Sequence, residues 1–343
     1  MDLSKYLNKG LTGLQNTGNS CYINSCLQLL SNVYELNELM DGLENKNVNN
    51  NENGIMLSEW NSLRKIMWSD NCTVAPIRFC KVVQFVSVKK NNELFSGFEQ
   101  NDISEFLFFI IDCFHSALKR EVNMNISGKV KNSLDKLALS CYEMMKNMYK
   151  KEYSEILDIF YGISVTVIKS FNDEILSNNC EPFSILTLPI PNLKECSIYD
   201  CLDLYTKDEE LKGENAWFND KTNLNEDVKK SLKFWSLPKI LILGLSRYNN
   251  SNRKLQSLVN CPLYNLDLSK YVIGYGGIEI NNYELFGTAN HSGNVNGGHY
   301  TANIKNLNGK WYNFNDQIIN EISDSKVISV YTYYLFYRKK NKN

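Results

Sequence analysis

A cysteine near one end of the chain and a histidine near the other have the surroundings of a nucleophile and its general base. Cys21 lies in GLQNTGNSCYINSCLQ, where a turn rich in Gly, Asn and Ser comes just before an apolar-periodic stretch. This order predicts that the thiol stands at a helix N-terminus, where the partial positive charge of the first turn favours the thiolate. A neighbouring imidazolium, from His299 in HSGNVNGGHYTANI, would lower the pKa of the thiol further.

The turn before Cys21 carries side chains that suit attack on a carbonyl. Asn16 can offer its amide hydrogens to a developing oxyanion, and Gly18 lets the backbone approach a substrate closely. Ser20 has the type and position of a helix cap. We therefore expect one short segment to hold the nucleophile and the oxyanion donor together.

The residues around His299 predict how its ring is held. Two glycines before His299 indicate a tight turn into a strand that reads YTANIKN, and an Asn-Gly hairpin signal at 308–309 connects this strand to KWYNFND. Such a ribbon brings Asn315 and Asp316 back beside His299. An acceptor there would bind the ring nitrogen that faces away from Cys21 and fix its tautomer, which is the logic of a catalytic triad.

Both segments resemble the cysteine and histidine boxes of the ubiquitin-specific proteases, which are papain-like deubiquitinating enzymes. Further segments agree in the same order along the chain. FSGFEQNDISEFLFFIIDCFH at 95–115 resembles the glutamine and aspartate box, IFYGI and EPFSILTLPIP resemble the entry to the fingers and the return from them, and LPKILILGLSRY and YTYYLFYRK resemble late palm strands. The resemblance runs from about Leu11 to Arg338 and implies one α+β, papain-like catalytic domain.

The resemblance also divides the chain. It implies a helical thumb over about 11–150, extended β fingers over about 155–235 and a β-sheet palm mostly over 236–338. Residues 1–10 would be an N-terminal extension, and the basic residues 339–343 a frayed tail.

The periodicity of apolar residues agrees with this division. Spacings of three and four predict helices over 22–40, 56–68, 76–90, 101–119 and 133–157. Runs rich in β-branched and aromatic residues predict strands at 183–190, 239–246, 283–290, 300–306, 310–315 and 332–338. Helices first and strands later indicate an α+β architecture, with the nucleophile and the base facing each other across a cleft.

Carried over residue by residue, the resemblance implies Cys21 as nucleophile, His299 as general base, Asn315 as the third member of the triad and Asn16 as oxyanion donor. Asp316 is a second candidate for orienting the ring, because the amide of Asn315 cannot neutralise an imidazolium as a carboxylate would.

Substrate residues follow from the same comparison. Asp102 and Glu105 resemble family acids that meet the basic, extended C-terminal tail of ubiquitin, and Gln100 would help to hold the cleft. A narrow channel lined by carboxylates suits a tail that carries arginines and ends in Gly-Gly. Bland alternatives stay open: a solvated helix edge for the two acids, a structural hydrogen bond for His291 and a plain strand aromatic for Tyr300. The further residues expected at the substrate site are His291, Gly298 and Tyr300.

The implied function is a thiol isopeptidase that hydrolyses the bond after the C-terminal glycine of ubiquitin through a cysteine thioester, with no cofactor. Ubiquitin and ubiquitinated proteins are the expected partners of a monomeric enzyme. Two alternatives stay open: a ubiquitin-binding module that has lost turnover, and a papain-like protease for another ubiquitin-like protein.

The fingers depart from the family pattern. The segments 165–168 (VTVI) and 218–221 (FNDK) stand where family members have the CxxC pairs that hold zinc, and the nearest cysteines, Cys180, Cys196 and Cys201, lack that spacing. Four soft ligands are needed to close a tetrahedral site. We therefore expect no metal, and fingers held by strand pairing and apolar contacts.

Composition sets the remaining expectations. The chain has 343 residues, 43% of them hydrophobic, and a net charge of -1, which argues against nucleic acid as a partner. Its longest apolar strand run, 240–245, is far shorter than the roughly 20 residues that cross a bilayer. Ten cysteines without a CxxC spacing, and a polar start too short for a secretory signal, predict a cytosolic or nuclear protein with reduced thiols. The asparagine-rich segment 45–54 is expected to be flexible and solvated.

Overall fold

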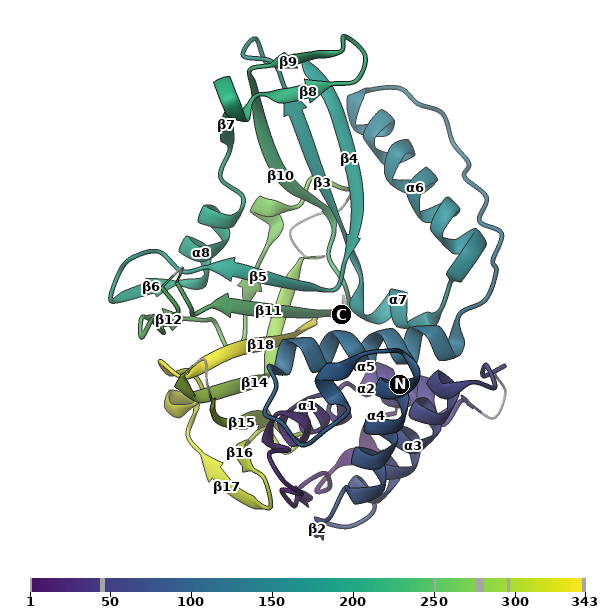
Figure 1. Cartoon of the computed structure of the whole chain (residues 1–343), viewed down its shortest axis with the longest axis vertical. Helices are drawn as coiled ribbons and strands as arrows, with labels where there is room; N and C mark the ends of the chain where they lie inside the picture. The colour runs from purple at the N-terminus through teal and green to yellow at the C-terminus, as the bar shows by residue number, and fades with distance from the viewer. Residues whose placement is uncertain (1, 44–46, 250, 276–280, 295–296, 341–343) are drawn as a thin grey trace.

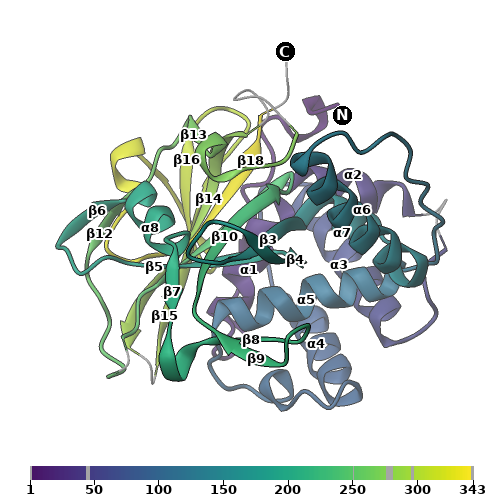
Figure 2. The ribbon, with the colours of Figure 1, turned by 90° about the horizontal axis from the view of Figure 1, so that it is seen from above.

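The structure, a computed structural model, describes residues 2–43, 47–249, 251–275, 281–294 and 297–340. A helical half packs against a central sheet, and a smaller sheet stands above both in the view of Figure 1. Seen from above, most of the helices lie on one side of the central sheet, and α8 lies on the other side, where it contacts β5 (Figure 2). The arrangement confirms the α+β class.

Two of the expected helices are each divided into a pair. Val33 interrupts the stretch 22–40 and Tyr153 interrupts the stretch 133–157, because both residues adopt extended backbone. The helices are α1 (Cys21–Ser31), α2 (Tyr34–Asp41), α3 (Glu52–Met67), α4 (Ile77–Lys89), α5 (Ile103–Leu118), α6 (Ser133–Glu152), α7 (Glu155–Phe160) and α8 (Ile198–Tyr205).

The asparagine-rich segment is only partly as expected. Residues 44–46 lie outside the described residues, but the segment after them is tied down. The backbone N–H of Asn49 donates to the Ala117 carbonyl at 2.8 Å, and the Asn51 side chain caps α3 by accepting from two backbone N–H groups. Asparagine is a strong N-cap residue, so part of this segment serves to start a helix.

The central sheet makes neighbours of strands that are far apart in the chain. Its order is β17-β16-β15-β14-β18-β11-β5, with β13 paired to β14, and the strands are antiparallel except for the β11–β5 pair. Gly309, at φ 83°, closes the β15–β16 hairpin that the Asn-Gly signal predicts. The bounds are β5 (Ile185–Pro189), β11 (Ile240–Ser246), β13 (Leu266–Asp267), β14 (Asn282–Asn294), β15 (Gly297–Lys305), β16 (Trp311–Asn315), β17 (Ile318–Ile322) and β18 (Thr332–Lys339).

The smaller sheet has the order β4-β3-β10-β7. Its strands β3 and β10 lie outside the runs from which strands were predicted, since lysines interrupt the apolar pattern of β10. The bounds are β3 (Gly162–Lys169), β4 (Ile175–Phe183), β7 (Glu209–Leu211) and β10 (Val228–Ser236), with shorter pairs β1 (Gly13–Leu14) and β2 (Thr73–Val74), β6 (Glu195–Ser197) and β12 (Leu258–Asn260), and β8 (Trp217–Asn219) and β9 (Leu224–Glu226).

Helix α6 covers one face of this smaller sheet. Cys141 of α6, Val165 of β3 and Trp235 of β10 belong to one buried apolar cluster. Within the described part of the chain, no group of three or more His, Cys, Asp or Glu side chains is placed to hold a metal ion. Strand pairing and this cluster hold the smaller sheet together.

Helix α1 is central to the fold. All of its residues are buried, polar ones included, and it packs between α5 and the strands β14, β15 and β16. Its first residue, Cys21, therefore stands where the helical half meets the sheet. None of the described helices is long and apolar enough to span a membrane.

Candidate active site

Cys21 is the first residue of α1, as the sequence predicts, and its side chain is buried. The cap differs from the expectation, because the Ser20 side chain makes no capping hydrogen bond to the helix. Its hydroxyl instead accepts from the Thr17 backbone N–H at 2.9 Å and lies 3.3 Å from the Asn16 side-chain oxygen. Ser20 thus holds the turn before the thiol in shape.

The expected lowering of the Cys21 pKa is wrong for the free protein. Burial raises the pKa of the Cys21 thiol, and backbone hydrogen bonds from Tyr300 and Tyr22 only partly oppose this. The carboxylate of Asp316 raises the pKa further. The thiol is consequently protonated at neutral pH, and its reaction requires a base.

His299 lies on β15, and Asn315 at the end of β16 holds its ring. The side-chain oxygen of Asn315 is 2.6 Å from Nε2 of His299. A carbonyl oxygen can only accept, so Nε2 carries the hydrogen and Nδ1 is left unprotonated, as a general base requires. The glycines before His299 lie in β15, not in the expected turn, because the strand begins at Gly297.

Asp316 is held by α1 and the turn before it, away from the ring of His299. Its φ of 51° turns the chain after β16, and its carboxylate accepts from the side-chain amides of Asn24 at 2.8 Å and Asn16 at 3.0 Å. Asn16 also accepts from the backbone N–H groups of Gly18 and Ser20. One amide hydrogen of Asn16 is used on Asp316, which fixes the direction of the other.

The Cys21 thiol and the His299 ring are linked through the backbone of β15. The hydrogen bond from Tyr300 to the Cys21 sulfur comes from the residue directly after His299. Among the described residues, the hydrogen-bond partner of the His299 ring is Asn315, and no hydrogen bond joins the ring to the thiol. The structure therefore places the thiol against β15, the strand that carries the base and that lies between β16 and β14 in the sheet.

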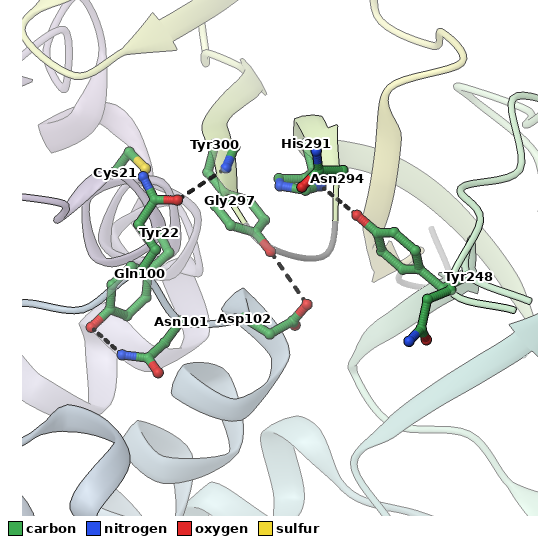
Figure 3. A pocket seen from close by; sticks show the side chains of 12 residues that line it. Cys21, Tyr22, Gln100, Asn101, Asp102, Tyr248, His291, Asn294, Gly297 and Tyr300 are labelled. Carbon is green, nitrogen blue, oxygen red and sulfur yellow. Dashed lines mark hydrogen bonds between the residues drawn. The ribbon is translucent and has the colours of Figure 1, made fainter. Parts of the chain in front are cut away.

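Gln100 joins the two halves across the cleft. Its side-chain oxygen accepts from the Gly298 backbone N–H at 2.9 Å. A Cβ at position 298 would lie 2.3 Å from Nε2 of His291, so only glycine lets the strand and this ring pack together. Figure 3 shows Gln100 reaching toward β15 beside Cys21.

Asp102 is engaged by tyrosines of the sheet half. One of its oxygens caps α5 by accepting from Ser104, and the other accepts from the hydroxyls of Tyr333 at 2.9 Å and Tyr300 at 3.3 Å. Asp102 is thus neither a solvated edge nor an unpaired acid. Glu105, one turn further along α5, is exposed.

His291 is a buried, neutral wall of the cleft. Its Nδ1 lies 3.0 Å from the Lys254 ammonium and 3.3 Å from the Tyr248 hydroxyl, and its ring stacks on Tyr300 at 4.5 Å between centroids. Burial, assisted by the Lys254 charge, lowers the pKa of His291 to about 4. The ring accepts from the ammonium and carries no charge at neutral pH.

These residues enclose a groove of about 310 Å³ that ends at the thiol (Figure 3), which we call the cleft groove. The wall residues that were not expected from the sequence include Tyr22, Tyr248 and Asn252. Tyr22 follows the nucleophile directly and could have been found by its position, whereas no local pattern marks the other two. The residues expected at the site that line the groove are Cys21, Gln100, Asp102, His291, Gly298 and Tyr300.

Comparisons with known proteins agree with this geometry. The family model described as Ubiquitin carboxyl-terminal hydrolase matches residues 12–337. Ubiquitin carboxyl-terminal hydrolase 2 of Bos taurus is 32% identical over 344 residues, which cover 96% of this chain and 55% of the relative. The Gallus gallus protein of the same description is 33% identical, with 96% of this chain and 93% of the relative covered.

Other relatives are longer, so the chain spans only part of them. The match to Usp2 of Drosophila melanogaster, at 29% identity, covers 96% of this chain but 35% of that protein. The chain thus spans between a third and about half of the length of several curated relatives that it matches.

Among solved structures, a chain of the SAGA Ubp8/Sgf11/Sus1/Sgf73 DUB module bound to ubiquitin aldehyde has a TM-score of 0.73 and 25% identity, with 99% of this chain and 72% of that chain covered. A chain of the yeast SAGA DUB module has a TM-score of 0.73 and 26% identity, with 100% and 72% covered. With a family model matched over nearly its whole length, the chain belongs to the ubiquitin carboxyl-terminal hydrolase family.

Proposed function

We propose that this chain is a thiol-dependent deubiquitinase that hydrolyses the bond after the C-terminal glycine of ubiquitin. The observation that carries the proposal is the His299–Asn315 pair at 2.6 Å, which leaves Nδ1 as a base near the start of β15. The next residue of that strand, Tyr300, meets Cys21 at the start of α1 through its backbone. The family supports the substrate class, since one structural relative is described as bound to ubiquitin aldehyde.

The geometry supports a papain-like sequence of steps. Nδ1 of His299 takes the proton of Cys21 while the sulfur attacks the glycine carbonyl, and the amide of Asn16 donates to the oxyanion. The lysine amine leaves with the proton from His299, and water then hydrolyses the thioester. Asn315 holds the ring, and Asp316 acts on Asn16, not on the ring.

The cleft groove suits the tail of ubiquitin. Gln100, Gly298 and Tyr300 narrow it, and Asp102 places a carboxylate beside it. Because Asp102 already accepts from Tyr300 and Tyr333, we assign to it the positioning of these rings together with a share of the charge that attracts a basic tail. Glu105 is exposed and free to meet that tail directly.

A ubiquitin probe with a C-terminal electrophile tests the proposal. Under reducing conditions we expect one adduct, located on Cys21 by peptide mass spectrometry, and none with Cys21→Ser. A wild-type protein that stays unlabelled would remove the proposal.

A ubiquitin-binding module without turnover is the second candidate. The raised pKa of Cys21 and its bond to the Tyr300 backbone, in place of the His299 ring, favour it. Hydrolysis of a ubiquitin–fluorophore conjugate would exclude this candidate, whereas tight binding without hydrolysis would support it.

The third candidate is a papain-like protease that acts on the C-terminal tail of another ubiquitin-like protein. Competition between the ubiquitin probe and ubiquitin-like proteins for labelling of the protein distinguishes this candidate from a deubiquitinase.

We also propose that the protein acts as a monomer, with no metal or other cofactor, in the cytosol or nucleus. The cleft groove is completed within one chain, and all ten cysteines are free thiols. Elemental analysis and size-exclusion chromatography of the purified protein test the first two points.

A further inference from the structure

A second groove lies on the other side of His299. It has a volume of about 330 Å³ and is formed by strands β14 to β17 and the segment before β18. We call it the asparagine groove, after the asparagines that line it. Its lining includes Ser292, His299, Thr301, Asn313, Asn320 and Lys326.

The alternation of β15 explains why the two grooves are separate. Tyr300, Ala302 and Ile304 point into the core shared with α1, so Thr301 points to the opposite face of the strand, where it lines the asparagine groove together with His299. Cys21 lines the cleft groove and His299 lines the asparagine groove, and the Tyr300 backbone joins them.

The proposed reaction assigns one side of the scissile bond to each groove. The glycine carbonyl and the tail before it occupy the cleft groove, which ends at the thiol. The amine on the other side takes its proton from His299, so it must lie at that ring. The chain that carries the amine then continues into the groove that His299 lines.

The asparagine groove has the chemistry of a peptide-binding surface. The side chain of Asn313 donates to Asn303 at 2.8 Å, and Asn303 donates to the Val327 carbonyl at 3.0 Å, which fixes the floor. Among the described residues, the side chains of Thr301 and Asn320 form no hydrogen bonds. They are therefore available to the backbone of a bound segment.

Lys326 gives the groove its charge. It is exposed and, within the described part of the chain, forms no ion pair, and no Asp or Glu is among the residues that line the groove. The neighbouring acids are engaged elsewhere, since Glu321 pairs with Lys310 and Asp324 accepts from the Tyr264 hydroxyl. An acidic side chain of a ligand would meet here a cation that has no ion-pair partner in the described structure.

We propose that the asparagine groove binds the segment of the ubiquitinated protein that flanks the modified lysine, and that Lys326 favours an acidic residue in that segment. The inference rests on the proposed function, because it needs the amine to leave past His299. It adds a preference on the substrate side that the tail of ubiquitin cannot supply.

The test compares three substrates: ubiquitin linked through its C-terminal glycine to the lysine of a peptide with Asp neighbours, the same with Lys neighbours, and a ubiquitin–aminomethylcoumarin amide without a peptide. We expect kcat/KM for the acidic peptide to exceed that for the basic peptide by about fivefold at low salt, and the ratio to fall toward one at high salt. Lys326→Glu should invert the ratio.

The ratio is a sharp readout, because a general loss of activity does not change it. Lys146→Glu, the same charge change at an exposed position on α6, is the matched control and should leave the ratio and the coumarin turnover as in the wild type. A wild-type ratio near one, or a ratio that Lys326→Glu leaves unchanged while the coumarin amide is turned over, would overturn the inference alone. If the protein cleaves none of the three substrates, both the inference and the proposed function are overturned.

Discussion

The cleft groove and the asparagine groove lie on either side of the same histidine but are built differently. The cleft groove takes Tyr22 and Asp102 from the helical half and Tyr248 and His291 from the sheet half. The asparagine groove is made by adjacent strands of one sheet and the turn after them. The first therefore depends on how the two halves dock, whereas the second needs only the local sheet.

This difference matches the two tasks in the proposed reaction. A single tail sequence enters the cleft groove, so rigid contacts across the halves, such as the Gln100–Gly298 bond, suit it. Many different segments would enter the asparagine groove, and an open strand surface with spare amide groups tolerates that variety. Substitutions on one side of His299 should therefore leave the other groove unchanged.

Replacing the nucleophile should have the largest effect and should spare both grooves. We expect Cys21→Ala to lower kcat/KM by more than about 10⁴-fold, as when one member of a concerted catalytic unit is removed. The affinity for ubiquitin, measured by calorimetry, should stay within about twofold, because the cleft groove keeps its walls. Lost affinity together with a lowered melting temperature would show that the thiol also supports the cleft.

Replacing Asn315, which holds the His299 ring, should lower the rate for every substrate equally, whichever groove that substrate occupies. Asn315→Ala removes the bond at 2.6 Å that fixes the tautomer of His299, and we expect a fall of about 10²-fold in kcat for every substrate. Asp316→Asn is the comparison, since it keeps the size of the side chain and changes only the partner of Asn16 and Asn24. A larger fall in kcat for Asp316→Asn than for Asn315→Ala would mean that the placement of Asn16 contributes more to the rate than the orientation of the His299 ring.

The raised pKa of Cys21 predicts how its reactivity depends on pH. Because burial holds the thiol protonated, the thiolate fraction of the free protein should rise about tenfold per pH unit between pH 6 and 8. Iodoacetamide labelling of Cys21, followed by mass spectrometry, measures this slope. Labelling that is flat over this range would show that a neighbouring cation already stabilises the thiolate.

Removing the Gln100–Gly298 hydrogen bond across the cleft should have the smallest effect and should not change the asparagine groove. Gln100→Ala removes the acceptor of the Gly298 N–H, and we expect KM for all ubiquitin conjugates to rise by about fivefold, which corresponds to one hydrogen bond of about 1 kcal/mol. The ratio between acidic and basic peptides should not change. A changed ratio would show that the two grooves are coupled.

Part of the site follows from local sequence. The turn before Cys21 and the apolar stretch after it are sufficient to predict the start of α1, and the Asn-Gly hairpin is sufficient to predict that β16 returns beside His299. These inferences hold because turn chemistry and apolar periodicity act over a few residues.

Other parts were decided by contacts between distant segments. Asn315 and Asp316 are adjacent in sequence, yet one meets His299 and the other meets Asn16 and Asn24, since the positive φ at Asp316 turns its side chain toward α1. The engagement of Asp102 by Tyr300 and Tyr333 likewise requires the two halves to be docked.

The sequence by itself determined the identity of the reacting groups and the class of the fold, because both are carried by short motifs and by periodicity. Only the tertiary structure decided the direction in which the Cys21 pKa is shifted, the hydrogen-bond partners of Asp102 and Asp316, and the existence of a second groove. Burial and desolvation depend on which surfaces meet, and residues such as Lys326 and Tyr248 acquire their neighbours only when the strands are assembled.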